Sequence, residues 1–146
     1  MKYIINTAIT LFLSYLFFFC SDQGVSPDRA NYEIPSSDVS YYRDLQPMFN
    51  GKCGFGSQCH APENPTNGLF FNTKLGFISY TFSRTGDQLV DPIVHKEAPQ
   101  FAPLVILLNE QYADYDFKHP SGYGREPLNS NQITGIKTWI SEGCKD

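Results

Sequence analysis

The clearest hydrophobic pattern lies near the C-terminus, where apolar residues recur at helical spacing. Asn129 and Gln132 have the spacing of a capping box, in which each side chain bonds the backbone of the other residue. Gly143 follows at the position where a left-handed residue ends many helices. The pattern therefore predicts a helix over residues 130–142, with one apolar stripe made of Ile133, Ile136, Trp139 and Ile140.

A second helix is predicted upstream, over residues 38–51. Ser36 or Ser37 can cap its start, whereas Pro47 should kink or shorten it. Its apolar positions are close to helical spacing and are Val39, Tyr42, Leu45 and Phe49.

The middle of the chain is predicted to be rich in loops. Glycines and prolines make residues 52–68 a loop, and residues 69–82 do not distinguish a short helix from a short strand. Pro103 can occupy the first turn of a short, uniformly apolar and therefore buried helix that runs through Leu108. The aromatic residues of the middle can wall a cofactor pocket or simply form core; they are Phe70, Phe71, Phe77, Tyr80 and Phe82.

The N-terminal residues 1–20 differ from the rest of the chain. Lys2 precedes an uncharged apolar run, which is the pattern of a secretory signal. Cys20 closes the run and resembles the lipidated cysteine of bacterial lipoproteins, although Phe19 stands where a small residue is usual. We expect an exported lipoprotein at the periplasmic or outer surface; plain secretion and an uncleaved membrane anchor are the alternatives. Residues 21–38 then predict a flexible tether, and residues 39–146 predict one folded domain.

Charge and motifs exclude several classes of function. The net charge of the chain is -4, and removal of residues 1–20 takes away one lysine and no acid. No basic cluster is present to neutralise phosphates, so we expect no nucleic-acid partner, whereas a basic protein partner would suit the acidic surface. The sequence also lacks the G-x-S-x-G, zincin and phosphate-loop motifs on which hydrolase or nucleotide chemistry would depend.

Three cysteines remain after Cys20, namely Cys53, Cys59 and Cys144. Export would place them in an oxidising compartment, where thiols rarely persist, and an odd number cannot pair off completely. Either one thiol is left over, or some of the sulfurs are bonded to something other than cysteine. The Cys59-His60 dipeptide suggests haem, because in c-type haem sites the histidine after the second cysteine ligates the iron.

The surroundings of this dipeptide resemble a family of bacterial c-type cytochromes. Residues 44–49 (DLQPMF) are similar to the D-[IL]-Q-P-[IM]-F run before that family's first haem cysteine, and Gly68-Leu69 to the G-L after its haem histidine. Residues 136–143 (IKTWISEG) are similar to its terminal I-x-x-W-I-x-x-G helix. The resemblance implies an all-α domain around one haem c, in which the first and last helices cross. It also implies an electron-transfer protein rather than an enzyme, with redox proteins as partners.

In this resemblance His60 is the proximal iron ligand and Cys59 holds the haem through a thioether bond. The spacing departs from the usual one, because five residues separate Cys53 from Cys59 and Gly56 stands where the first cysteine is expected. Either a longer loop delivers both sulfurs to the haem, or Cys59 alone is attached. In the second case Cys53 is available for a disulfide with Cys144, since the two cysteines end the first and last predicted helices.

The distal iron ligand is the less certain part of the resemblance. In the family it lies shortly before the final helix, where this chain has His119-Pro120-Ser121-Gly122, so His119 is the candidate. His95 is the second choice, and either histidine can instead be an ordinary surface residue. Met48 is expected in the core. If neither histidine reaches the iron, a five-coordinate haem would suit a ligand sensor.

Two further interpretations remain open. Cys53 and Cys59 can form a small disulfide loop in an exported binding or structural lipoprotein that holds no haem, which leaves Cys144 unexplained. Alternatively, Cys53, Cys59 and His60 can bind zinc or copper together with His95 or His119. The C-x5-C-H spacing matches none that is common for zinc.

Overall fold

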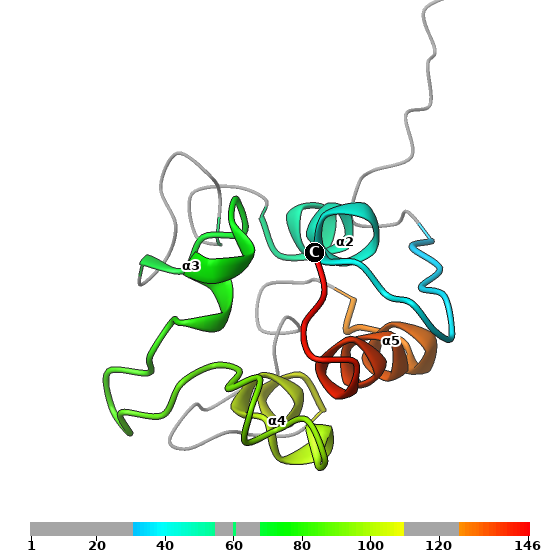
Figure 1. Cartoon of the computed structure of the whole chain (residues 1–146). Coiled ribbons are helices and arrows are strands. Elements are labelled where there is room, and N and C mark those ends of the chain that lie inside the picture. The colour runs from blue at the N-terminus through cyan, green and yellow to red at the C-terminus, as the bar shows by residue number, and fades with distance from the viewer. Residues whose placement is uncertain (1–30, 55–59, 61–67, 110–125) are drawn as a thin grey trace, which may run out of the picture.

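The computed structural model describes residues 31–54, 60, 68–109 and 126–146 (Figure 1). Regular structure within these ranges is helical, apart from one isolated antiparallel bridge between Thr81 and Gln88. None of the described helices is long and apolar enough to cross a membrane. The helical elements are η3 (Tyr41–Leu45, a π-helical turn), α2 (Gln46–Lys52), α3 (Lys74–Ile78), η5 (Pro99–Phe101, a 3-10 turn), α4 (Pro103–Asn109) and α5 (Ser130–Ser141). The described residues thus confirm an all-α composition, with loops in the middle.

The last helix, α5, forms as the sequence predicts. The Asn129 side chain accepts a hydrogen bond from the backbone N–H of Gln132, and the Gln132 side chain accepts one from Asn129, each at 3.0 Å. The helix ends at Ser141, and Gly143 adopts the left-handed region with φ of 85°. Cys144 follows it there with φ of 57°, while its N–H donates to the Trp139 carbonyl at 2.9 Å and closes the helix.

The first helical segment begins later than the sequence predicts. Ser40 is the capping residue, because its Oγ accepts the backbone N–H of Arg43 at 3.1 Å, so the predicted caps at Ser36 and Ser37 are wrong. Pro47 lies in the first turn of α2, at the point where the π-helical turn of η3 changes to α-helix. It therefore begins α2 after the π-helical turn of η3 and does not break the segment.

The core forms where η3, α3 and α5 meet. The Trp139 ring of α5 is 5.7 Å from the Tyr41 ring of η3 and 6.4 Å from the Phe77 ring of α3, measured between centroids. All three side chains are almost completely buried, as is Met48, which confirms its expected place in the core. On its other side α5 contacts α4 and η5, so it lies between the first helical segment and α4 (Figure 1).

The packed structure extends further toward the N-terminus than the predicted boundary at residue 39. Ile34 is buried, and its backbone N–H and C=O both bond the side chain of Asn131 on α5, at 2.8 and 3.0 Å. The Tyr32 carbonyl accepts a hydrogen bond from the Gln132 side chain at 3.2 Å. Residues 32–34 therefore belong to the domain, and the tether predicted over residues 21–38 is wrong at this end.

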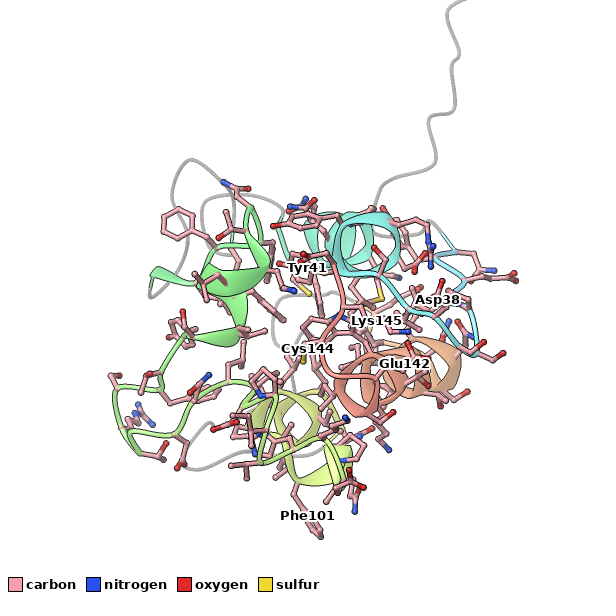
Figure 2. All side chains as sticks on the ribbon, viewed as in Figure 1. Asp38, Tyr41, Phe101, Glu142, Cys144 and Lys145 are labelled. Atoms are coloured by element: carbon pink, nitrogen blue, oxygen red, sulfur yellow. The ribbon has the colours of Figure 1, made fainter. Side chains whose placement is uncertain are left out.

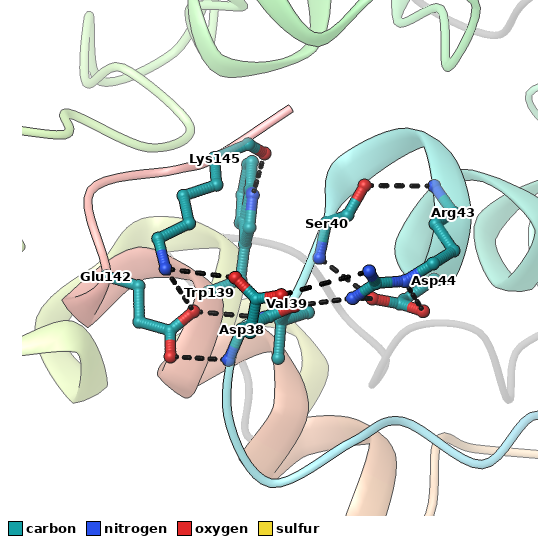
Figure 3. A network of polar contacts seen from close by, with 8 residues as sticks. All are labelled: Asp38, Val39, Ser40, Arg43, Asp44, Trp139, Glu142 and Lys145. Carbon is teal, nitrogen blue, oxygen red and sulfur yellow. Dashed lines mark hydrogen bonds and ion pairs between the residues drawn. The ribbon is translucent and has the colours of Figure 1, made fainter.

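A polar network joins the start of the domain to its end (Figure 3). The Glu142 carboxylate accepts the backbone N–H groups of Asp38 at 2.7 Å and Val39 at 3.0 Å. The Lys145 ammonium lies 3.2 Å from an Asp38 carboxylate oxygen and 3.6 Å from one of Glu142. The hydrogen bond from the Asp38 N–H lowers the pKa of Glu142 most. The bond from Val39 and the positive charge of Lys145 lower it further.

The pKa of Glu142 gives a prediction for acid stability. The folded state lowers this pKa, so the ionised Glu142 carboxylate stabilises the folded protein. This stabilisation is complete above the unfolded pKa of about 4.3 and is lost as the pH falls through the lowered folded value. A Glu142→Gln variant should therefore lose less stability than the wild type between neutral and acid pH. Urea midpoints of both proteins, measured across this range, give the difference. Midpoints that fall equally with pH in the two proteins would contradict the lowered pKa of Glu142.

Candidate cofactor site around His60

His60 is held at the end of α2 by a closed loop. Cys53 is the C-cap of α2, and its backbone N–H donates to the Phe49 carbonyl at 2.7 Å. The Cys53 carbonyl in turn accepts the backbone N–H of His60 at 3.0 Å. The two residues that the sequence assigns to one cofactor site are therefore brought together by a hydrogen bond across the loop between them.

Cys53 and His60 line the same apolar cavity. The Nδ1 atom of the His60 ring is buried, and the ring lies edge-on to Phe71 with centroids 5.5 Å apart. Leu104, Leu107 and Leu108 approach from α4, where a spacing of three and four residues puts them on one face of the helix. The rest of the wall consists of Phe49, Leu69, Phe71, Phe77 and Leu89.

Of the three segments whose motifs support the resemblance, residues 44–49 and 68–69 reach this wall, and residues 136–143 do not line it. Gln46 donates from its side chain to the carbonyl of Phe71 at 2.7 Å, and the Tyr41 hydroxyl donates to the same carbonyl at 2.9 Å. Phe71 is thereby fixed to the first helical segment, with its ring against His60. Phe49, at the end of the DLQPMF run, stacks on Phe71 at 5.4 Å, and Leu69 lines the cavity.

The donors fit haem c, whereas the open space among the described residues is small. An imidazole with a cysteine beside it and aromatic and leucine side chains around it is the donor set and polarity that a covalently bound haem requires. The volume open to water molecules is about 40 Å³, far below the roughly 300–1,000 Å³ of pockets that enclose drug-sized ligands. The described residues therefore supply one apolar wall with an imidazole in it, and not a complete site.

Cys144 lies outside this cavity. Its side chain is buried, and burial raises the pKa of its thiol to about 11, so the thiol is protonated at neutral pH and a poor nucleophile. No disulfide joins Cys53 to Cys144 in the structure, and of the two only Cys53 reaches the cavity beside His60. The structure therefore gives no support to the Cys53–Cys144 pairing, which stays an alternative from the sequence.

His95 has a local role away from His60. Its Nδ1 accepts the backbone N–H of Asp91 at 2.9 Å and so holds the turn between them. His95 lines a separate surface groove rather than the cavity. Of the other predicted site residues, Cys20, Cys59 and His119 lie outside the described part of the chain. Within that part no group of three or more His, Cys, Asp or Glu residues lies close enough to hold a metal ion.

The leucine wall of α4 is the part of the site that the sequence analysis missed. The run from Leu104 to Leu108 was expected to be buried, but nothing in a uniformly apolar helix indicates which of its faces borders a cavity. The aromatic residues between positions 69 and 82 do not all take one of the two expected roles. Phe71 and Phe77 line the cavity, Phe82 is buried in the core, and Phe70 is exposed.

Comparison with known proteins adds no family to this description. No family model, curated protein or solved structure matches the chain.

Proposed function

We propose that the chain is an exported mono-haem c-type cytochrome, which carries single electrons between redox protein partners. The observation that supports it most strongly is the position of His60. Its ring enters an aromatic and leucine-lined cavity that also contains the sulfur-bearing residue Cys53. The haem would supply the one-electron chemistry, and the chain would bind it, orient it and set its surroundings.

Each residue has a role in this proposal. His60 would be the proximal ligand, through one of its two ring nitrogens. Cys59 would form one thioether bond. Because Cys53 borders the cavity and Cys144 does not, we favour Cys53 as the second thioether over a disulfide between these two. His119 remains the proposed distal ligand.

The cavity wall would set the surroundings of the haem. Phe71, Phe77 and the leucines of α4 would exclude water from one side of the haem. An apolar surrounding disfavours additional charge at the iron, and this polarity is one of the features by which a protein sets a haem potential. Lipidation at Cys20 would attach the domain to a membrane at the periplasmic or outer surface, where its partners would meet it.

A second candidate is an exported binding or structural lipoprotein that holds no haem. The packing of the core favours it. Trp139, Tyr41 and Phe77 contact one another directly, and the open space beside His60 is only about 40 Å³. Such a domain would fold cooperatively without a cofactor, whereas a cytochrome would lose stability.

Serine variants of the two cysteines test the proposal. After expression with c-type haem machinery, the double variant Cys53→Ser, Cys59→Ser should abolish covalent haem, because it removes both proposed thioether sulfurs. Cys53→Ser should shift the pyridine haemochrome band to that of a single thioether. Cys144→Ser is the matched control, and its spectrum should equal that of the wild type. Covalent haem that persists in the double variant would contradict the assignment.

A further inference from the structure

The short helix α4 borders two different sites. Leu104, Leu107 and Leu108 face the His60 cavity, whereas Pro103 and Ile106 line a groove on the molecular surface. The groove has an open volume of about 400 Å³. Since a helix with its side chains is about 10–12 Å across, the groove lies one helix thickness from the candidate cofactor site.

The edge of this groove is unusually apolar for an exposed surface. Val94 and Phe101 line it and expose 67% and 66% of their surface, and the adjoining Ile93 exposes 86%. Figure 2 shows Phe101 projecting away from the body of the domain. Exposed apolar residues that gather at a groove, unlike scattered ones, indicate a surface that binds a partner.

The charges in the groove are negative. Asp87 and Asp91 line it, and no lysine or arginine among the described residues does. Asp91 is fixed in place, because its carboxylate accepts the backbone N–H groups of Ile93 at 2.8 Å and Val94 at 3.0 Å. These hydrogen bonds lower the pKa of Asp91 and so maintain its charge beside the apolar edge.

We propose that this groove docks a cationic segment with apolar side chains on the surface of a partner protein. A role of this docking in electron transfer rests on the proposed function. The docked segment would then lie on one side of α4, and the proposed haem on the other. The negative charges favour a basic protein over an anionic membrane, which they would repel. Charge steering with a small apolar contact also suits redox partners, whose complexes are small and short-lived.

Binding of a defined peptide tests the groove on the full chain, with and without haem. The probe is a fluorescent peptide of alternating lysine and leucine, and its counterpart has glutamate in place of lysine. The lysine peptide should bind, more weakly at high salt, and the glutamate peptide should not. Phe101→Ala and Asp91→Asn should each weaken binding about tenfold. Asparagine keeps the oxygen that accepts the two backbone N–H groups, so the turn is preserved.

Leu75→Ala is the matched control, because Leu75 is 71% exposed on α3 and does not line the groove. It should leave binding of the lysine peptide unchanged. Equal binding of the two peptides, or equal effects of Phe101→Ala and Leu75→Ala, would overturn the proposal. Phe101-dependent binding to vesicles containing phosphatidylglycerol, without peptide binding, would assign the surface to a membrane instead. If the chain binds the lysine peptide but never takes up haem, the cytochrome proposal is wrong and the groove proposal stands.

Discussion

A His60→Ala variant is expected to show a changed haem absorption spectrum, because the iron would lose its proximal ligand while the proposed thioether bonds still hold the haem. His60 is the proposed axial ligand, and its ring also packs against Phe71 in the cavity wall. Removal of the imidazole takes away the iron bond and leaves the wall with a gap. The ratio of the haem band to protein absorbance measures the loading, and circular dichroism shows whether the variant is folded.

Two further variants separate ligation from folding. His95→Ala should keep the wild-type spectrum, because His95 holds a local turn and lies outside the His60 cavity. Imidazole added to a His60→Gly variant should restore the spectrum, since the free base can occupy the vacated position. A His60→Ala protein with the wild-type spectrum would remove His60 from the proposal.

A Gly135→Ala variant is expected to be less stable than the wild type by about 1–2 kcal/mol. In an ordinary helix this change is favourable by about 1 kcal/mol. Here the new Cβ would overlap the side chain of Ile34, which is buried against α5. Overpacking of this kind costs about 1–3 kcal/mol, and displaced Ile34 would also lose its bonds to Asn131. Urea unfolding monitored by circular dichroism measures the change.

The same contact predicts how the loss can be reversed. In an Ile34→Gly background the overlapping side-chain atoms, the Cβ included, are gone, so Gly135→Ala should there be neutral or stabilising. The difference between the two backgrounds gives the coupling between positions 34 and 135. A Gly135→Ala variant that is more stable than the wild type would show that residues 32–34 do not pack on α5.

Sequence patterns were most informative where local chemistry decides the structure. The capping box of Asn129 and Gln132, the glycine at 143 and the apolar stripe of α5 are all short-range signals, and the helix forms as predicted. The cap of the first segment was misplaced because three serines precede it, and only the backbone geometry at Ser40 shows which one accepts a helical N–H.

Long-range packing was not visible in the sequence. Residues 32–34 look like linker because they lie in a stretch of Pro, Gly, Ser and charged residues without apolar periodicity. Ile34 nevertheless fits over the bare backbone of Gly135, about a hundred residues away. For the site, the Cys59-His60 dipeptide suggested His60, and the C-x5-C-H spacing added Cys53. The structure places His60 and Cys53 on one cavity. The leucines opposite them come from α4, whose cavity face is defined only once the helices pack.

The most direct test of the central claim is a haem stain on a denaturing gel, after expression of the full chain with c-type haem machinery. We predict that the band of the protein stains, because covalently attached haem survives denaturation. A band without haem, from a protein that still unfolds cooperatively, would contradict the cytochrome proposal and favour the lipoprotein that holds no haem.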